Sequence, residues 1–407
     1  MTDEKKKQGL RLKGEVDLIQ MDGSLLINAG TSRFTRISGE YAPLAKRMME
    51  MLKDGAQLQE IYKAFDDDLD EMDVDEILET LDQYQMIEKT SMDYGLSKDE
   101  LARYRQQINH LVARFPMDAA ENYIHQLKNL NVFVYGAEML AGRIIQSLLL
   151  TGVGTVNVFT NLNEVAADEV FNTTFYRTED VGKNKQEVIV KRAKELNPHV
   201  KLNVFYEEED QEVLKNADLV ILAFDIPNHA AYEEINRFLV KHKKVSLLCG
   251  FVQDDFFYGP TMVPGETACY ACFEKRCRGN KTFFNEYLSY MEFLKQKQRA
   301  GNAMGVRLDM IASFVVNEVL LLIPYLEKNI AQIMSRRIGV MTMEESVYLN
   351  NVFRYGRPVT WNNQVTIEFY PQFKLVNNPV LRLPRCEVCG STADKKPMLS
   401  PWSLPLE

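Results

Sequence analysis

The sequence lacks any uninterrupted apolar run of the roughly 20 residues needed to span a bilayer, although 46% of its 407 residues are hydrophobic. Its first residues, MTDEKKKQGLRLKG, carry charges but no apolar segment of the kind a secretory signal requires. An excess of basic residues is also missing, since the net charge is −9. This charge argues against a general binder of nucleic acid or of anionic membranes. We therefore expect a cytoplasmic protein with no nucleic-acid or membrane partner.

Histidine and cysteine are scarce, which narrows the choice of metal ligands. The five histidines show no ligand spacing, and we assign them no role. Four of the six cysteines form two C-x2-C pairs, Cys269 with Cys272 and Cys386 with Cys389. Two such pairs are the usual arrangement of a structural zinc site, which would fasten the C-terminal tail to the main domain across 113 intervening residues. Redox pairs or two unrelated reduced pairs are the alternatives.

The segment 131–160, NVFVYGAEMLAGRIIQSLLLTGVGTVNVFT, has the pattern of a complete β–α–β unit. An apolar run ends at Gly136, apolar residues then recur at helical spacing up to Gly152, and a second apolar run follows. This pattern predicts a Rossmann-type α/β domain. A phosphate-binding fingerprint would have glycines where this chain has Glu138 and Met139. The segment therefore indicates the fold more clearly than it indicates phosphate binding.

Residues 1–89 have the pattern of a separate winged-helix-like module, with short strands followed by three helices. We predict Asp73 as the N-cap of the third helix, with Glu76 completing a capping box. This helix is acidic and would be repelled by DNA phosphates, so a winged-helix regulator is the weaker interpretation. An extended peptide that adds to the last strand and packs on the third helix fits better. The predicted peptide-binding residues are Arg33, Phe34, Thr35, Arg36, Ile37, Ile77 and Leu81.

Several motifs between residues 103 and 325 resemble the ThiF/MoeB family, relatives of ubiquitin-activating enzymes. Arg103 and Tyr104 match an entry motif in a helical connector, residues 90–130, and VGKNKQEVIVKRAKELNPHV and GETACYACF resemble segments of the family's α/β domain. The resemblance assigns residues 131–407 to that domain, with its zinc knuckle closed by the tail. It places Lys185 at an ATP-contacting lysine and Asp225 at a magnesium-associated aspartate, with Gly136 in the cofactor turn. It also implies a homodimer with the apolar helix of residues 309–326 in or near the interface.

The chain departs from this family where ATP would bind. Thr160 stands in place of an aspartate that holds the ribose, and Leu162 in place of a second acidic residue. An asparagine–arginine pair falls at Asn172 and Thr173, so the arginine is missing. The sequence therefore leaves open whether ATP and magnesium bind. If the protein is an ATP-using enzyme, Lys185 and Asp225 are its candidate catalytic residues.

Two further resemblances suggest a function. The strand–helix order around RFTRISGEYAPLAKRMMEML is similar to PqqD-like recognition elements, which capture leader peptides of ribosomal natural products. The tail NPVLRLPRCEVCG resembles those of proteins that work with YcaO-type cyclodehydratases in azoline-containing bacteriocin biosynthesis. Together they imply a non-catalytic subunit that presents a precursor peptide to that enzyme. The alternatives are an enzyme that itself adenylates the peptide, of microcin or pantocin type, and a sulfur-carrier activator, for which no convincing catalytic cysteine is found.

Overall fold

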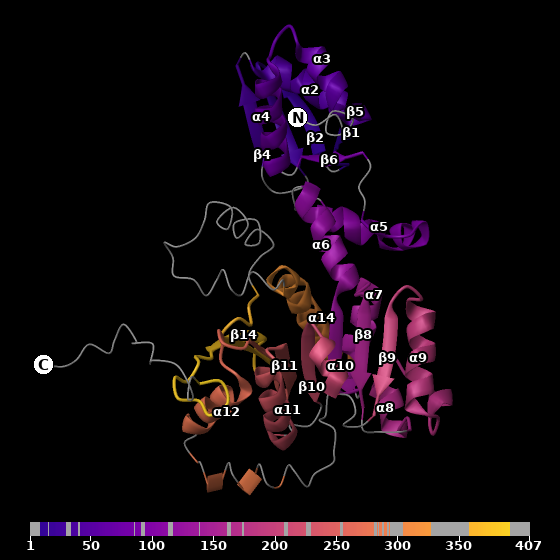
Figure 1. The fold of residues 1–407 in the computed structure, drawn as a ribbon, viewed down its shortest axis with the longest axis vertical. Helices are drawn as coiled ribbons and strands as arrows, with labels where there is room; N and C mark the ends of the chain where they lie inside the picture. The colour runs from indigo at the N-terminus through magenta and orange to yellow at the C-terminus, as the bar shows by residue number, and fades with distance from the viewer. Residues whose placement is uncertain are drawn as a thin grey trace, which may run out of the picture. The chain divides into compact units, whose positions relative to one another are not determined.

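The structure is a computed structural model that divides into two compact units, Met1–Gln126 and Leu127–Glu407 (Figure 1). The predicted boundaries at residues 89 and 130 stay predictions. The residues that the structure describes are 9–14, 16–29, 34–39, 41–84, 86–90, 94–112, 117–137, 139–160, 164–172, 175–206, 211–224, 229–252, 255–280, 283, 285–286, 289–290, 293, 304–326 and 358–390.

The first unit joins two small sheets to a set of helices around one apolar core. Within its described residues the strand orders are β5-β1-β6 and β2-β3-β4, so that β2 and β4 are edge strands. The strands and the three helices that follow them lie where the sequence predicts. The elements are β1 (Gly9–Leu12), β2 (Val16–Met21), β3 (Ser24–Ala29), β4 (Phe34–Ser38), α2 (Tyr41–Asp54), β5 (Ala56–Gln57), α3 (Leu58–Phe65), α4 (Glu71–Gln83), β6 (Ile87–Lys89), α5 (Lys98–Val112) and α6 (Met117–Asn129).

The start of α4 corrects one prediction. The helix begins one turn earlier than predicted, with Asp70 as N-cap in place of Asp73. Asp70 Oδ1 accepts a hydrogen bond from the Asp73 backbone N–H at 2.8 Å, and Asp73 Oδ2 accepts one from the Asp70 backbone N–H at 3.3 Å. Asp73 followed by Glu76 fits the sequence pattern of a capping box, whereas Asp70 is followed at the same spacing by an aspartate, so the pattern alone favoured the wrong cap.

The second unit is built on a large mixed sheet that confirms the predicted β–α–β unit. Its described strands have the order β14-β13-β12-β11-β10-β7-β8-β9, parallel from β11 to β9 and antiparallel from β12 to β14. The elements are β7 (Asn131–Tyr135), α7 (Met139–Thr151), β8 (Thr155–Phe159), α8 (Ala167–Asn172), α9 (Lys185–Leu196), β9 (Lys201–Phe205), α10 (Gln211–Asn216), β10 (Leu219–Phe224), α11 (His229–Lys241), β11 (Val245–Val252), β12 (Asp255–Met262), α12 (Tyr270–Gly279), α14 (Gly305–Leu322), β13 (Asn363–Glu368) and β14 (Lys374–Pro379).

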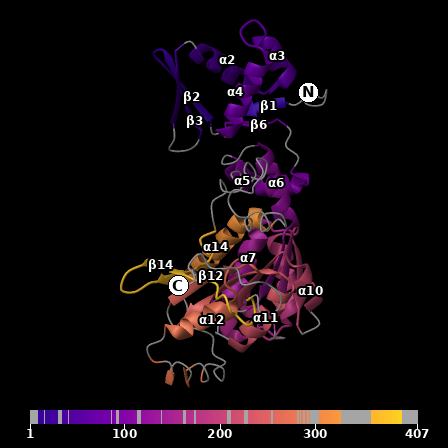
Figure 2. The same ribbon diagram turned by 60° about the vertical axis from the view of Figure 1, so that its left-hand side comes forward.

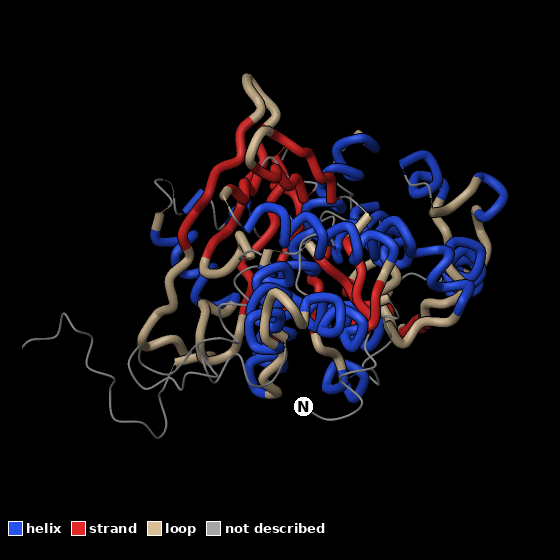
Figure 3. Tube along the Cα trace, turned by 90° about the horizontal axis from the view of Figure 1, so that it is seen from above, coloured by secondary structure: helices blue, strands red, loops and turns tan. Residues whose placement is uncertain are grey.

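Helices cover both faces of this sheet, as its fully apolar central strands require. One face packs alternate strand residues such as Phe133 and Val220 against α10, α11 and α12. On the other face α7 contacts β7, β8 and β10 and lies along α14, while α9 lies along β9. Figure 2 shows the pairs α7–α14 and α11–α12 side by side, and Figure 3 separates the strands from the helices by colour. Cys249 is fully buried in β11.

Helix α14 is fixed to the C-terminal part of the sheet by a buried carboxylate. Glu318, which is 1% exposed, accepts from the backbone N–H and the hydroxyl of Thr360, each at 2.6 Å. The Thr360 hydroxyl in turn lies 2.5 Å from that of Thr261 on β12. The helix therefore anchors the turn from which β13 and β14 begin. Among the described residues, none of the helices combines the length and apolar character needed to cross a membrane.

Candidate functional site

The carboxyl ends of β7, β8 and β10 form the first candidate site. The chain leaves β7 for β8 on one side and later returns to β10 on the other, and ligands of doubly wound sheets bind at this kind of switch point. Gly136, with φ of 119°, makes the turn after β7, and its N–H donates to Phe159 O at 3.0 Å. The neighbouring Ala137 carbonyl accepts from the Tyr176 hydroxyl at 3.1 Å. Both turn residues thus use backbone groups in contacts within the protein.

Lys185 lies beside this turn and is already paired. It opens α9, its side chain is fully buried, and Nζ donates to Glu169 Oε1 at 2.6 Å. The same ammonium lies 5.7 Å from the centre of the Tyr176 ring. Glu169, on α8, is also buried, and its second oxygen accepts from Ala166 N at 2.8 Å. The lysine that the sequence singled out therefore has its charge balanced by an internal carboxylate, which the sequence analysis missed.

A second buried ion pair lies in the same region. Arg192 of α9 donates to Asp180 at 2.8 Å, and both side chains are about 5% exposed or less. Burial alone would raise the pKa of Asp180, but the hydrogen bonds from Arg192 and the Arg177 backbone outweigh burial and lower it. The pair ties α9 to the loop before it.

The other predicted cofactor positions add little to this site. Thr160 is fully buried at the end of β8, and its N–H donates to Phe205 O. Asn172 ends α8, but its side chain lies outside the described residues, as do Glu138, Leu162, Thr173 and Asp225. The structure thus brings Gly136 and Lys185 to one region of the sheet and does not place Asp225.

The four paired cysteines form the second candidate site, a cluster that could hold a metal ion. Their sulfur atoms all lie within 4.8 Å of one another, and all four residues are buried. The S···S distances are 3.9 Å for Cys269–Cys272, 3.7 Å for Cys269–Cys386 and 3.4 Å for Cys272–Cys389. A disulfide needs about 2.05 Å, whereas a tetrahedral ion with sulfur ligands at about 2.3 Å separates them by about 3.8 Å. The observed spacing fits the ion.

The tail is shaped around this cluster by residues that the sequence analysis did not single out. Leu383 N donates to Cys272 Sγ at 3.3 Å, and the Arg382 guanidinium donates to the Cys389 carbonyl. A Cβ on Gly390 would lie 2.3 Å from the Cys386 carbonyl, so this position requires glycine. Hydrogen bonds from Cys269 and Cys272 lower the pKa of the Cys389 thiol, while the pKa values of the Cys269 and Cys272 thiols are raised. The metal-binding form of cysteine is the thiolate, and a bound cation would stabilise it at all four positions.

The predicted peptide-binding residues divide between surface and core in the first unit. Phe34 on β4 is 60% exposed, while Arg36 donates to the Ser24 hydroxyl at 3.1 Å. Leu81 is buried in the core, and Ile37 and Ile77 pack against it. Thr35 is half-buried, and Arg33 lies outside the described residues. The edge of β4 is the part of this predicted surface that offers unpaired backbone groups.

These features define a mixed α/β protein with a large Rossmann-type sheet and a four-cysteine cluster. The model of the ThiF family matches residues 104–347, which is more than half of the chain. The chain belongs to the ThiF family.

Curated relatives match less than half of the chain. The sulfur carrier protein adenylyltransferase of Thermus thermophilus is 30% identical over 184 residues, 43% of this chain and 65% of that protein. SUMO-activating enzyme subunit 1 of Homo sapiens is 28% identical over 140 residues, 34% of this chain and 37% of that protein. The chain thus spans less than two thirds of either relative.

Solved structures extend the likeness of fold to almost the whole chain. E. coli MccB with succinimide aligns at a TM-score of 0.64 and 18% identity, covering 94% of this chain and 99% of MccB. PaaA aligns at a TM-score of 0.59 and 18% identity, covering 91% of this chain and all of that one. At identities this low, the similarity shows that this chain shares the fold of these proteins.

Proposed function

We propose that this protein binds the leader of a ribosomal precursor peptide and presents its core to a separate YcaO-type cyclodehydratase, which forms azolines with ATP. The observation that carries the proposal is the buried Lys185–Glu169 pair. A lysine binds a phosphate through an ammonium group that is not already paired. Here the Lys185 side chain is fully buried, and its Nζ lies 2.6 Å from the Glu169 carboxylate. Binding a nucleotide there would require breaking this pair and leaving Glu169 beside the phosphates, where its charge repels them. The α/β domain then acts as a scaffold, and leader capture raises the concentration of the core at the partner enzyme.

The first unit supplies the peptide site in this proposal, as a PqqD-like, winged-helix-like element. Support comes from MccB, the microcin C7 biosynthetic enzyme, whose structures include one with N-formylated MccA and align over 94% of this chain. An extended leader adds to the open edge of β4, with main-chain hydrogen bonds supplying affinity. The exposed ring of Phe34 lies on that strand and is the best position at which to test the surface.

Nucleotide binding separates the scaffold from an enzyme. We expect calorimetric titration with ATP and magnesium to give no heat of binding, with or without a candidate leader. Mass spectrometry measures azoline formation by this protein together with its precursor peptide and the cyclodehydratase. We expect the double variant Lys185→Met with Glu169→Gln, which removes both charges together, to support azoline formation as wild type does. Lys183→Met, two residues away at a site 54% exposed, is the matched control. Micromolar ATP binding, or loss of product in the folded double variant alone, would sink the scaffold proposal.

Leader binding is tested on the full chain with two matched surface variants. Phe34→Asp alters the β4 edge, and Ile19→Asp alters the opposite edge strand β2 at a side chain 46% exposed. The probes are fluorescein-labelled synthetic peptides for each short reading frame encoded beside the gene. We expect Phe34→Asp to weaken binding at least tenfold in fluorescence anisotropy and Ile19→Asp to leave it unchanged. Equal effects of the two would contradict a leader site on β4.

A second candidate is an ATP-using enzyme that adenylates the precursor peptide itself. Family membership favours it, as do relatives such as the Thermus adenylyltransferase and the alignment with MccB bound to ATP. In this case Lys185 would leave Glu169 to contact the phosphates of ATP, and Asp225 would be the residue that holds the magnesium. Pyrophosphate release that depends on the leader and is lost in Lys185→Met would establish this enzyme in place of the scaffold.

We further infer that the ion of the four-cysteine cluster is zinc and that the protein is a cytoplasmic homodimer. Four thiolates in tetrahedral array are the usual set for structural zinc, and the buried sulfur spacing supports this choice. Metal analysis of fresh protein is expected to give one zinc per chain. Less than half an equivalent would count against zinc, and a monomeric mass in light scattering would count against the dimer.

A further inference from the structure

Asn236 joins α11 to the start of α12, where Cys269 is the N-cap and Cys272 lies in the first turn. Its side chain is 2% exposed, and Oδ1 accepts from the backbone N–H of Tyr270 at 3.0 Å. Tyr270 follows Cys269 directly and is the first residue of α12. The amide oxygen therefore fixes the backbone between Cys269 and Cys272. Turning the amide over would lose this bond, so the position of Nδ2 is set as well.

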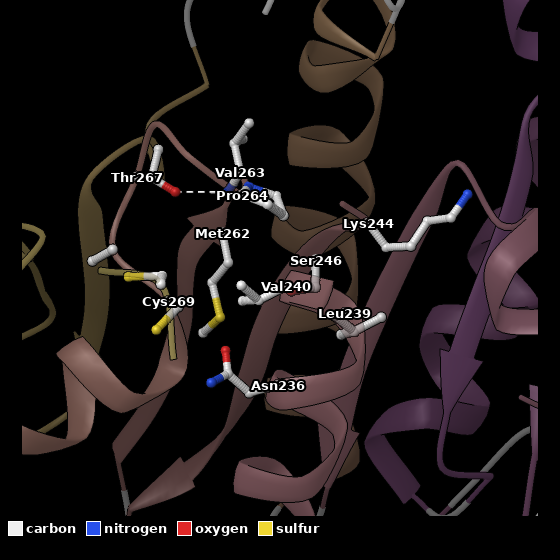
Figure 4. Close-up of a pocket in the computed structure, with 12 residues that line it drawn as sticks. Asn236, Leu239, Val240, Lys244, Ser246, Met262, Val263, Pro264, Thr267 and Cys269 are labelled. Atoms are coloured by element: carbon white, nitrogen blue, oxygen red, sulfur yellow. Dashed lines mark hydrogen bonds between the residues drawn. The ribbon is translucent and has the colours of Figure 1, made fainter. Parts of the chain in front are cut away.

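The amide nitrogen of Asn236 is the unusual atom. Nδ2 is buried, and it has no hydrogen-bond partner among the residues that the structure describes. Asn236 lines a small cavity of about 10 Å³ together with Cys269 and Cys389 (Figure 4). The cavity is lined mostly by apolar groups, with the amide of Asn236 among its few polar ones, and its volume is about the least that a single water molecule needs. Buried donors in native proteins almost always have an acceptor, so this one indicates a partner in the cavity.

The chemistry of a four-thiolate metal site supplies that partner. Four thiolates around a divalent cation carry a net charge of about −2, and a buried charge of this kind needs nearby N–H donors. Cys272 has one in Leu383 N at 3.3 Å. Cys269 and Cys389 face the cavity that contains the amide group of Asn236.

We propose that Asn236 is a positioning residue of the metal site, whose Nδ2–H stabilises the thiolate of Cys269 or Cys389 through one water molecule in this cavity. The inference rests on the proposed zinc ion. Its chemistry is charge-assisted hydrogen bonding to a metal-bound thiolate, which holds the sulfur in place and lowers its tendency to take up a proton. The same side chain thus orients the helix that carries Cys272 and balances the charge of the site.

Two substitutions separate these roles. Asn236→Asp keeps an oxygen for Tyr270 N–H and replaces the donor with an acceptor that repels thiolates. Asn236→Leu removes both groups. Ser246→Ala changes another side chain of the same cavity and is the matched control. If Asn236 only anchors α12, Asn236→Asp keeps the acceptor for Tyr270 N–H and retains zinc better than Asn236→Leu does.

Zinc release to a chromogenic chelator is measured on the full chain, with zinc content determined first. We expect Asn236→Asp to weaken zinc retention by about 10- to 100-fold, at least as strongly as Asn236→Leu, and Ser246→Ala to leave it unchanged. In cobalt-substituted protein the sulfur-to-cobalt charge-transfer band is expected to shift in Asn236→Asp. A change of stability alone would not move that band.

Several results would overturn the proposal. Wild-type retention and an unshifted cobalt band in folded Asn236→Asp would do so, with zinc itself still in place. If that variant does not fold by circular dichroism, Asn236→Ala serves in the same assay, and release at the wild-type rate would again be decisive. Wild-type protein with less than half an equivalent of zinc would overturn the zinc inference first, and this one with it.

Discussion

At the scale of single residues, the pairing of Lys185 with Glu169 has energetic consequences that can be measured. Removing one partner leaves the other charge buried and uncompensated, which costs about 3–5 kcal/mol. Removing both together avoids that cost, and Glu169→Gln retains a side-chain oxygen that can accept from the Ala166 N–H. We therefore predict that Lys185→Met lowers the free energy of unfolding by about 3 kcal/mol or more, and that Lys185→Met with Glu169→Gln recovers most of it.

Guanidinium denaturation of the two single variants and the double variant gives the coupling energy directly. Losses that simply add would contradict a buried, mutually dependent pair.

The pair formed by Asp180 and Arg192 predicts how stability depends on pH. The pKa of Asp180 is lowered in the folded state, because hydrogen bonds from Arg192 outweigh the effect of burial. A group with a depressed folded pKa stabilises the protein above its unfolded pKa of about 3.9, and this stabilisation is lost as pH falls through the folded value. We expect the unfolding free energy of wild type to decrease more between about pH 6 and pH 3 than that of Asp180→Asn.

Urea unfolding at a series of pH values measures this difference. Glu234→Gln, at an exposed position on α11, is the control and should follow wild type. Parallel curves for wild type and Asp180→Asn would exclude the assigned role.

At the same scale, the sequence predicted some parts of these sites and could not predict others. The two C-x2-C pairs were identified by spacing alone, and the structure brings all four sulfurs together. Lys185 was singled out as a candidate, but its partner Glu169 was not, because a carboxylate 16 positions away forms no local pattern with a lysine. Asn236 was missed for the same reason, since only the fold brings α11 to α12. Contacts between distant segments depend on packing, which local periodicity does not encode.

At the scale of elements, the turn before β8 leaves no room for a side chain at Gly154, because it lies against the backbone of Lys128 in the same unit. An added Cβ there would lie 1.8 Å from the Lys128 carbonyl oxygen, which is backbone and cannot move aside cheaply. We predict that Gly154→Ala lowers the unfolding free energy by about 3 kcal/mol or more, within the range of severe overpacking. Thermal unfolding followed by circular dichroism measures it.

Gly142, inside α7, is the matched control for this effect. Among the described residues a Cβ there meets only the Ala137 carbonyl oxygen, at 3.9 Å. Gly142→Ala is therefore expected to be neutral or to stabilise the helix by about 0.5–1 kcal/mol. Similar destabilisation by both substitutions would show that helix packing, and not the clash at Gly154, limits these positions.

The anchor between α14 and the C-terminal strands gives an optical test. Glu318→Leu leaves the buried Thr360 N–H without its acceptor, which costs about 1–3 kcal/mol. Trp361, next in the chain and 5.6 Å from the ring of Tyr325, reports movement of this turn by its fluorescence. We expect a shifted emission in Glu318→Leu and near wild-type emission in Glu318→Gln, which keeps an acceptor oxygen. Identical spectra for all three proteins would contradict the anchor.

At the scale of the whole molecule, the metal site is predicted to hold the C-terminal segment on the large sheet. Removing the ion with a chelator leaves four buried thiols close together and frees residues 380–390. We expect faster amide hydrogen exchange in that segment and a lower thermal midpoint, both reversed by adding zinc. Cys386→Ser should behave like the chelated protein, and Cys277→Ser, outside the cluster, like wild type. Exchange that is insensitive to the chelator would contradict this role.

The division of the cysteine cluster between two distant segments also has a consequence for how the protein is made. Cys269 and Cys272 are translated long before Cys386 and Cys389. The ribosome therefore synthesises most strands of the large sheet before it adds the second pair of cysteines. A chain that ended after β14 would contain nearly every strand and would still lack Cys386 and Cys389, which complete the cluster. Closure of the cluster is therefore a late event, and it distinguishes full-length chains from prematurely terminated ones.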